Sequence, residues 1–225
     1  MSLKAAMPKL SDKQQHERRT RILDAAEQCF TRAGFHRTTM QDICKAAGVS
    51  PGAIYTWFDS KEALIGGITA RNRDEVLASF AAMATASDFV AGMAATLEAC
   101  VLNQPRAKSV LCLEIAAEAT RNPAIAAMMA TFDDAVRTSL ADILSRAVEE
   151  GRIKPQLPLR DLMPAMNAIA EGMFWRRAVD PAFDAAGAGR AFVAMVSAVL
   201  RPTAAGTAQK PGDAPGSAEL AEQGS

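Results

Sequence analysis

Hydroxyl, aromatic and basic side chains are concentrated between residues 38 and 61 of this chain of 225 residues. Such side chains donate hydrogen bonds to phosphates and base edges and stack on bases, so the chemistry they offer is recognition of nucleic acid. The sequence has no nucleophile elbow, phosphate-binding glycine loop or pair of catalytic carboxylates that would indicate bond making instead.

The segment that precedes most of these side chains predicts a short helix beginning at Thr39. Thr39 and Asp42 have the spacing of a capping box, in which each side chain accepts a hydrogen bond from the other residue's backbone N–H. Gly48 suits the left-handed conformation that often ends a helix. We therefore expect about two helical turns, closed by a tight turn at Gly48.

A second short helix is predicted from about Pro51 to Phe58. Ser50 can cap its N-terminus, and Pro51 fits the first helical position because its missing N–H would be unpaired there. Ile54 and Phe58 are four residues apart and face inward together, so the polar side chains between them turn outward. Two short helices joined by a glycine turn are typical of a helix-turn-helix, whose second helix enters the major groove of DNA.

A longer amphipathic helix is predicted ahead of these two, from about Asp12 to Ala33, where Gly34 ends it. The three helices are expected to enclose one small core. Its members are Ile22, Cys29, Phe30, Phe35, Ile43, Val49, Ile54 and Phe58. The alternative is a small helical domain without a ligand, but the outward aromatic and hydroxyl side chains favour DNA binding.

The charges are unevenly distributed along a chain that is neutral overall, with 25 basic and 25 acidic residues. Residues 1–66 contain ten basic and seven acidic residues, an excess of three positive charges, which leaves an equal negative excess in the remainder. A neutral chain argues against broad coating of nucleic acid. The basic residues near the N-terminus can contact phosphates, although a solvated arm is the alternative. They are Lys4, Lys9, Lys13, Arg18 and Arg19.

These N-terminal residues resemble the DNA-binding domain of the TetR family of bacterial transcriptional regulators. The resemblance covers about the first 65 residues. The residues that carry it are Arg21–Ala26, Phe30, Ala33–Phe35, Thr38, Thr39, Ile43, Ala46, Gly48–Ser50, Gly52, Ile54, Tyr55, Phe58 and Ser60–Leu64. The later phrase Glu114–Pro123 is similar to a segment in some members, whose C-terminal domains are otherwise variable.

The resemblance implies a role for each matching position. The helix opened by Thr38, Thr39 and Met40 would abut the DNA backbone, and Lys61 would pair with a phosphate. The complete set of expected DNA-binding residues is Arg19, Thr38, Thr39, Met40, Ser50, Pro51, Gly52, Ala53, Tyr55, Thr56, Trp57 and Lys61.

The rest of the chain predicts further helices and no strands, because aromatic residues are few and alanine-rich helical periodicity dominates. Proline and glycine residues separate helices expected over residues 61–83, 88–103, 106–120, 123–150, 159–179 and 185–200. We expect an all-α fold in which a three-helix helix-turn-helix domain (12–60) precedes a helical effector-binding and dimerisation domain (61–202). A flexible arm (1–11) and a disordered tail (203–225) are predicted at the ends.

The middle helices are rich in methionine and small residues, which can line a pliable pocket for a small molecule. Glu171 lies in an otherwise apolar helix, and Glu114 and Glu118 share a helix face, so an acid could orient a polar or cationic effector. The expected effector-binding residues are Met93, Leu97, Cys100, Leu111, Glu114, Glu118, Met128, Phe132, Glu171 and Trp175. The alternative is that the apolar residues form plain core and the acids a solvated face.

The last two predicted helices carry more apolar and small residues than an exposed hairpin needs. We expect them to form a four-helix interface with a second copy of the chain, as the resemblance also implies. The expected interface residues are Met166, Ile169, Ala170, Met173, Phe174, Phe192, Val193 and Val196. Two rigidly joined recognition helices would read palindromic double-stranded operator DNA with half-sites about one turn apart, ~34–36 Å.

The remaining residues with potential chemistry argue against a metal site or a cofactor. Cys29, Cys44, Cys100 and Cys112 lack metal-ligand spacing and are expected to be reduced, although a redox switch between the last two is the alternative. The only histidines, His16 and His36, lie in the N-terminal part, so a metal sensor is not expected. No signal peptide or membrane-crossing apolar run is present, which predicts a cytoplasmic protein.

These patterns together predict a homodimeric, sequence-specific transcriptional regulator, released from its operator as a repressor by a small-molecule effector. An enzyme or small-molecule carrier that only shares the helical packing is one alternative. An activator or a constitutive regulator of the same family is another. Turnover of a ligand would favour the enzyme, whereas tight specific DNA binding would favour a regulator.

Overall fold

The chain folds into helices in a computed structural model, which describes residues 11–203. Nine α-helices and one π-helix make up this part of the chain, where the only β-pairing is an isolated bridge between Ile153 and Pro202. The helices are α1 (Asp12–Ala33), α2 (Met40–Ala47), α3 (Pro51–Tyr55), α4 (Lys61–Thr85), α5 (Phe89–Leu97), η1 (Glu98–Leu102), α6 (Arg106–Ala119), α7 (Pro123–Glu149), α8 (Leu159–Val179) and α9 (Ala185–Leu200). The predicted all-α fold is confirmed.

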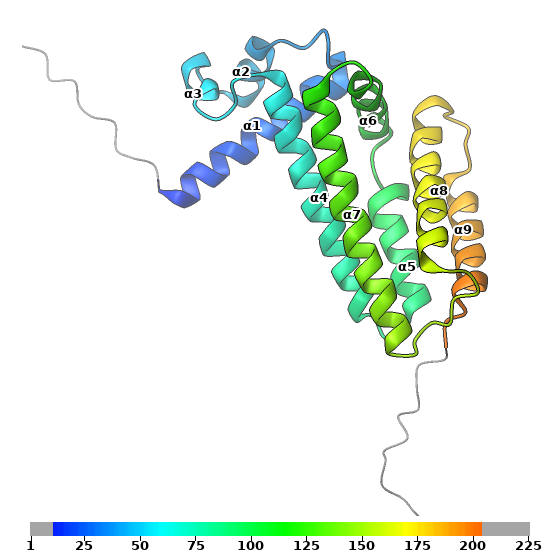
Figure 1. Ribbon diagram of the computed structural model, residues 1–225. Coiled ribbons are helices and arrows are strands. Elements are labelled where there is room, and N and C mark those ends of the chain that lie inside the picture. Colours follow the sequence, from blue (N-terminus) through cyan, green and yellow to red (C-terminus); the bar gives the residue numbers. More distant parts are fainter. Residues whose placement is uncertain (1–10, 204–225) are drawn as a thin grey trace, which may run out of the picture.

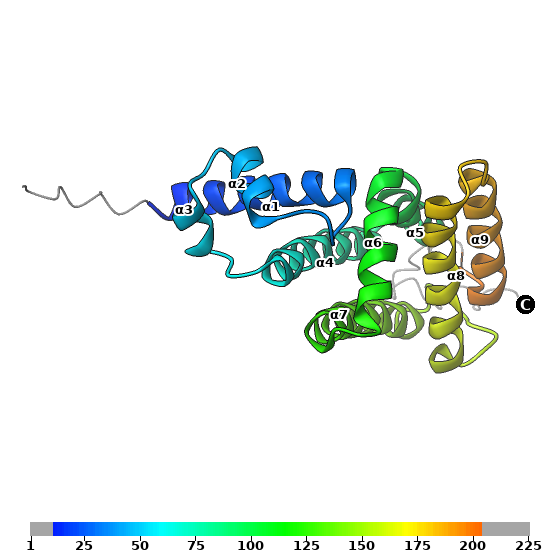
Figure 2. The same ribbon diagram turned by 90° about the horizontal axis from the view of Figure 1, so that it is seen from above.

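The helices form two groups along the molecule (Figure 1). Helices α1, α2 and α3 lie at one end, while α4 and α7 run side by side through the middle. Helices α8 and α9 lie side by side at the other edge, and α6 crosses between α1 and α8 when the molecule is seen from above (Figure 2). A structural change in the C-terminal helices can therefore be transmitted to the N-terminal helices through α4, α6 or α7.

Local capping explains where the N-terminal helices begin. The N–H of Asp42 donates to Thr39 Oγ1 (3.2 Å), and the N–H of Thr39 donates to Asp42 Oδ2 (3.0 Å), which completes the predicted capping box. The hydroxyl of Thr39, which also donates to Asp42 Oδ2 (2.7 Å), and then the N–H of Thr39 hold the pKa of the Asp42 carboxyl below its ordinary value. Gly48 adopts a left-handed φ of 63°, and the N–H of Ala53 donates to Ser50 Oγ (3.3 Å) at the start of α3. The predicted turn between two short helices is confirmed.

One hydrophobic core joins the first three helices to the rest of the molecule. It buries the predicted N-terminal core residues, with Val49 partly buried against them. It also contains Leu64, Ile65 and Ile68 of α4, together with residues of α6 and α7. The packing therefore continues across residue 60, and the domain limits expected from the sequence stay a prediction.

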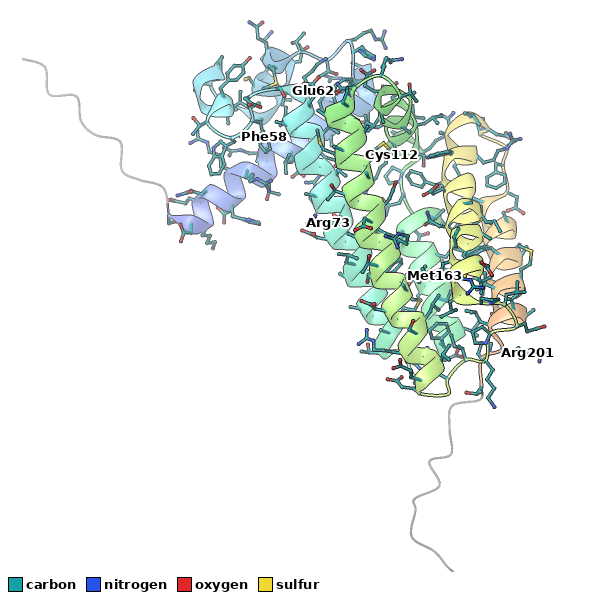
Figure 3. The ribbon with its side chains drawn as sticks, in the orientation of Figure 1. Phe58, Glu62, Arg73, Cys112, Met163 and Arg201 are labelled. Atoms are coloured by element: carbon teal, nitrogen blue, oxygen red, sulfur yellow. The ribbon has the colours of Figure 1, made fainter. Side chains whose placement is uncertain are left out.

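Helix α4 lies so close to the N-terminal helices that a side chain at Gly67 would not fit. A Cβ atom there would lie 2.7 Å from Leu23 Cδ2 and 3.0 Å from Phe58 Cε1. Phe58 projects between the N-terminal helices and α4 (Figure 3). Glycine at this position thus permits the close approach of α4 to α1 and to the end of the helix-turn-helix.

A second core fills the C-terminal group. Its buried residues come from α4, α5, η1, α7, α8 and α9, and they include Phe80, Met93, Leu144, Met166 and Phe192. The helix expected over residues 88–103 is shorter than predicted, because α5 ends at Leu97 and continues as the π-helix η1. The guanidinium of Arg177 donates to the carbonyls of Val101 and Gln104 and holds this non-α segment against α8.

The ends of the described part are held by specific hydrogen bonds. Ser11 caps α1, since its hydroxyl accepts from the N–H of Gln14 (3.3 Å). The N–H of Thr203 donates to the carbonyl of Arg152 (2.8 Å). These hydrogen bonds lie at the borders of the expected arm and tail, whose limits stay a prediction. Residues 1–10 and 204–225, which make up the rest of those two expected segments, lie outside the described residues.

Candidate DNA-binding surface and ligand cavity

The start of α3 and the residues after it form an open surface. Tyr55 is 53 % exposed, and Ser50, Pro51 and Thr56 are also exposed. No heavy atom lies within 4 Å of the position that a Cβ atom would take at Gly52, so a partner's backbone can approach there. This part of the predicted recognition helix is free to contact a groove of DNA.

Two of the residues expected to contact DNA do not lie on this open surface. Thr38 is buried, and its hydroxyl donates to the carbonyls of Gly34 (2.8 Å) and Cys29 (3.1 Å), so its side chain cannot reach DNA and that prediction is wrong. Trp57 is half-buried and packs against the first core, because α3 ends at Tyr55 and the chain turns there. Thr39 stays exposed, whereas Met40 and Ala53 are half-buried.

Lys61 has partners within the protein. Its Nζ donates to the carbonyls of Phe35 (2.7 Å) and His36 (3.3 Å), and it lies 4.6 Å from the centroid of the Phe35 ring. Lys61 thus closes the loop after α1 against the first turn of α4, and a phosphate contact by the same group stays a prediction. Arg19 is exposed, with its guanidinium 5.6 Å from the centroid of the Phe58 ring, so its charge is held over the N-terminal core.

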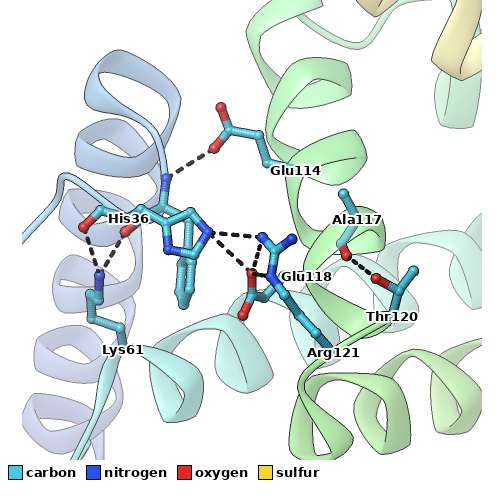
Figure 4. Close-up of polar contacts among 8 residues, drawn as sticks. His36, Lys61, Glu114, Ala117, Glu118, Thr120 and Arg121 are labelled. Carbon is cyan, nitrogen blue, oxygen red and sulfur yellow. Dashed lines mark hydrogen bonds and ion pairs between the residues drawn. The ribbon is translucent and has the colours of Figure 1, made fainter.

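Helix α6 holds the same loop from the other side (Figure 4). The N–H of Phe35 donates to Glu114 Oε2 (2.9 Å). Glu118 Oε2 lies 3.1 Å from His36 Nε2 and accepts a hydrogen bond from Arg121 Nε (2.7 Å). Glu114 and Glu118 therefore connect α6 to the DNA-binding part, and the prediction that they line the effector pocket is wrong.

A cavity of about 350 Å³ lies within the C-terminal group of helices. Seven of the expected effector-binding residues line it: Met93, Leu97, Cys100, Leu111, Phe132, Glu171 and Trp175. Met128 does not, because its Sδ lies against α4, 2.9 Å from the position of a Cβ atom at Gly66. A cavity of this volume with a mainly apolar lining is of the size that holds a small organic molecule.

Sequence reasoning missed four charged residues in the lining, Glu27, Glu75, Lys108 and Asp133. Asp133 follows Met129 by four residues and precedes Val136 by three, which puts it on the apolar face of α7. An acidic residue on the apolar face of a predicted helix is the sequence feature that could have identified Asp133. Burial raises the pKa of the Asp133 carboxyl. Burial also raises the pKa of Glu171, and the neighbouring charge of Asp133 raises it further, while a hydrogen bond from Asn167 acts in the opposite direction.

Comparison with known proteins agrees with this arrangement. Residues 22–68 match the family described as bacterial regulatory proteins of the tetR family. Residues 91–201 match the family described as the C-terminal region of BetI-type transcriptional repressors. The chain belongs to the TetR family.

Relatives of this TetR-family protein are similar over most of their length. The HTH-type transcriptional regulator UidR of Escherichia coli K12 is 35 % identical over 139 residues, which are 62 % of this chain and 70 % of UidR. The structure of Salmonella enterica GusR has 29 % identity and a TM-score of 0.70, covering 85 % of this chain and 98 % of GusR. A regulator from Saccharomonospora viridis, solved in complex with choline, has 21 % identity and a TM-score of 0.67, covering 81 % and 97 %.

Membership of the TetR family makes this protein a DNA-binding transcriptional regulator and not an enzyme. The family resemblance of the N-terminal residues is therefore confirmed, and the enzyme alternative is excluded. Within residues 11–203, no three His, Cys, Asp or Glu side chains lie together as metal ligands would. None of the helices in that range has the length and apolar character needed to span a membrane.

The expected dimer residues of this TetR-family protein divide into two sets. Met166, Met173, Phe192 and Val196 are buried inside the protomer, so the prediction that they form a dimer interface is wrong. Ala170, Phe174 and Val193 are half-buried, and Ile169 is 42 % exposed. Helices α8 and α9 carry apolar residues around most of their circumference, and the inward side packs against the second core. Only the outward side of α8 and α9 is therefore free to contact another chain.

The outward side of α8 and α9 carries exposed apolar and small residues. These are Ala165, Ala168, Ile169, Gly172 and Val179 of α8, and Ala191, Ala194, Met195 and Ala198 of α9. Small residues let two helix pairs approach closely, and exposed apolar side chains are unfavourable in water. This surface is called the α8–α9 face below.

Cys100 and Cys112 both line the cavity (Figure 3 labels Cys112), but their surroundings disfavour the thiolate. Burial raises the pKa of the Cys112 thiol to about 11, and burial likewise raises the pKa of Cys100. The thiolate is the nucleophile in disulfide exchange and alkylation. The raised pKa of both thiols argues against a redox switch between Cys100 and Cys112.

Alkylation by iodoacetamide should therefore modify native Cys112 slowly. With a pKa of about 11, only about one thiol in a thousand is ionised at pH 8, so we expect a rate at least about tenfold below that of a free thiol. The rate should rise roughly tenfold per pH unit up to pH 10, because the thiolate population rises in proportion. Mass spectrometry of timed samples measures this, with denatured protein as the control. Fast labelling of the native thiol at pH 8 would contradict the assignment.

Proposed function

We propose that this TetR-family regulator binds a palindromic operator as a homodimer, represses transcription there, and is released when a small molecule fills the cavity. Residues 12–60 would form the DNA-binding unit and residues 61–202 the unit for effector binding and dimerisation. The protein would act in the cytoplasm, where its DNA lies. The observation that carries the proposal is that α6 contributes to both the cavity and the loop after α1.

Helix α6 gives the cavity a direct connection to the DNA-binding part. Leu111, Cys112 and Ile115 of α6 line the cavity, while Glu114 on the same two turns accepts the hydrogen bond from the N–H of Phe35. A ligand that displaces the first three residues must move Glu114 as well, because one helix is rigid over two turns. The loop and the helices packed on it would follow, which changes the position of α3.

The homodimer is supported by the α8–α9 face. A two-fold interface uses the same surface on both copies, and a face of small residues lets two copies approach without charge repulsion. A single recognition helix of five residues offers little contact with DNA. Two of them, held at a fixed distance, would bind two half-sites and so favour palindromic operator sequences.

The response to an effector is supported by the cavity and by linkage. The related fold from Saccharomonospora viridis holds choline, so this architecture accommodates a small ligand. If a ligand lowers the affinity for the operator by some factor, the operator must lower the affinity for the ligand by the same factor. Coupling of this kind is typically ~1–3 kcal/mol, or about five- to 150-fold in affinity.

Selection of genomic DNA fragments by the purified protein, followed by sequencing, tests the proposal. We expect one recurrent palindrome upstream of a small number of genes, with half-sites about one helical turn apart, ~34–36 Å. Transcription from those promoters should rise when the gene for the protein is deleted. Weak recovery without sequence preference, abolished by moderate salt, would contradict specific operator binding.

Replacing Tyr55 with alanine should weaken operator binding by about ten- to 100-fold, since each lost base contact typically costs ~1–3 kcal/mol. Tyr55 is exposed and contributes little to either core, so the thermal unfolding midpoint should change little. Fluorescence anisotropy with the selected palindrome measures the affinity. The control is Val148→Ala, which truncates an exposed residue near the end of α7. Equal affinities of both variants and the parent protein would remove Tyr55 from the proposed contact surface.

A further inference from the structure

The cavity is built for a ligand with an apolar body. Apolar side chains of the six helices α4–α9 line most of its volume of about 350 Å³, among them Phe80, Phe89, Met93, Leu144, Met166 and Phe192. Removal of apolar ligand surface from water would therefore supply most of the affinity, and polar groups in the lining would set which ligand is accepted.

The charges in the lining do not balance. The cavity is lined by four carboxylates, from Glu27, Glu75, Asp133 and Glu171, and by a single basic side chain, Lys108. The carboxylate of Glu27 pairs with the guanidinium of Arg71, and that of Glu75 lies 3.8 Å from Lys108 Nζ. Two of the four acids are thus neutralised by the protein itself.

The other two acids, Asp133 and Glu171, have no basic partner among residues 11–203. The Glu171 carboxylate accepts only a hydrogen bond from Asn167 Nδ2 (2.7 Å), which is a neutral donor. Each acid lies on a different helix, α7 and α8, and they are close enough for the charge of Asp133 to raise the pKa of Glu171. A like-charged pair beside an apolar cavity is unfavourable until a positive charge joins it.

Aromatic side chains accompany both acids in the lining. Phe132 precedes Asp133 on α7, and Phe174 and Trp175 follow Glu171 by three and four residues, one turn along α8. The faces of aromatic rings attract cations, and tryptophan does so best. Carboxylates next to aromatic rings are a combination that binds an ammonium group even when that group has no N–H to donate.

We propose that the effector of this regulator is an amphipathic organic cation, whose positive group lies between Asp133 and Glu171 and whose apolar body fills the cavity. This inference rests on the proposed function, because it names the ligand class of the same cavity. The cation supplies the positive charge that the lining lacks, and Phe132, Phe174 and Trp175 cover it from the sides.

The same observations disfavour three other ligand classes. A hard divalent cation needs about six oxygen ligands, whereas two carboxylates and an apolar lining offer far fewer. An anionic ligand would meet two unneutralised carboxylates, and the one basic side chain, Lys108, is already close to Glu75. A neutral ligand gains the apolar contacts but leaves the like-charged pair uncompensated.

Three probes with the same decyl chain separate these classes: decyltrimethylammonium, decanol and decanoate. Isothermal titration calorimetry of the full-length protein measures their affinities, with the two ionic probes below their micelle concentrations and decanol below its solubility limit. We expect the ammonium probe to bind at least about tenfold more tightly than the alcohol, and the carboxylate to bind most weakly, since an opposite charge within a few ångströms favours the ionised pair. Equal or tighter binding of the alcohol would overturn the proposal.

Variants identify the acids responsible. The double variant Asp133→Asn and Glu171→Gln should lose the preference for the ammonium probe over the alcohol, while its affinity for decanol stays within about twofold, since neutral side chains of the same size keep the apolar cavity. Glu75→Gln is the matched control, because its carboxylate also lines the cavity but already has Lys108 nearby. A preference that survives in the double variant, or that is lost equally in Glu75→Gln, would overturn the assignment to these two acids.

The operator separates failure of this inference from failure of the proposed function. The selected palindrome is added, and its release by decyltrimethylammonium is followed by anisotropy. If the palindrome binds but no ammonium preference is found, the ligand class is wrong and operator binding stands. If the ammonium probe binds with the expected preference and no palindrome is ever selected, the ligand class stands and the proposed function is wrong.

Discussion

Gly172→Arg should turn the dimer into a monomer that binds the operator about 30- to 3,000-fold more weakly. Specific binding by a dimer is commonly 10³- to 10⁷-fold tighter than non-specific binding, and about half of that free energy is lost with one half-site. Gly172 lies on the outward side of α8, and no atom of the protomer lies within 4 Å of a Cβ atom there. Two copies of the arginine would meet across a two-fold interface and oppose each other by size and charge.

The fold of the protomer should not suffer from this change. Glycine inside a helix is less favourable than other residues by ~0.5–1 kcal/mol, so the arginine should raise the stability of α8 itself. Analytical ultracentrifugation gives the oligomeric state, and anisotropy with the palindrome gives the affinity. Ala82→Arg, on the exposed side of α4, is the control for an added charge. A variant that remains dimeric would move the interface away from the α8–α9 face.

Glu114→Ala should nearly abolish the effect of the ligand on operator affinity, while each partner still binds by itself. The change removes the acceptor of the hydrogen bond from the N–H of Phe35, so movement of α6 no longer reaches the loop after α1. Hydrogen bonds to a charged group contribute about 1.5–3 kcal/mol, which is as large as a typical coupling free energy. The factor by which the ligand lowers the affinity for the operator, about five- to 150-fold in the parent protein, should therefore fall towards one in the variant.

The measurement is a double titration of protein with the palindrome and decyltrimethylammonium, which yields the coupling factor directly. Glu149→Ala is the matched control, because it removes an exposed carboxylate at the end of α7, away from the loop. Undiminished coupling in Glu114→Ala would mean that the signal travels through α4 or α7 instead. Complete loss of operator binding without ligand would mean that the same hydrogen bond is needed to hold α3 in its DNA-binding position.

The sequence predicts helix limits well where the determinants are local. The limits of α1, α8 and α9 agree with those expected, because periodicity and flanking Gly, Pro and capping residues are read within a few positions. The capping box at Thr39 and the left-handed conformation of Gly48 are likewise determined by residues within a few positions. Helices α3 and α5 are exceptions. Helix α3 ends at Tyr55 rather than at about Phe58, and α5 gives way to η1, whose carbonyl of Val101 accepts from Arg177 far along the chain.

The sequence predicts less well which face of a helix meets which neighbour. Thr38 and Thr39 have the same functional group, but only the tertiary fold turns the first hydroxyl towards α1. Glu114 and Glu171 are both acids on largely apolar helices, and one holds a loop while the other lines the cavity. Met173 was expected at the dimer interface for the same reason, since apolar residues surround α8 and periodicity alone does not separate the inner side from the outer side.

The close approach of α4 at Gly67 limits how such a regulator can be rebuilt from parts. A biosensor made by joining residues 1–60 to the C-terminal part of another regulator would replace α4, and any residue larger than glycine would collide with Leu23 and Phe58. The transplanted piece would also lose Glu114, which the loop at Phe35 needs. A working hybrid must carry over the first turns of α4 and the matching surface of α6, so the unit that can be exchanged is a packed surface rather than a stretch of sequence.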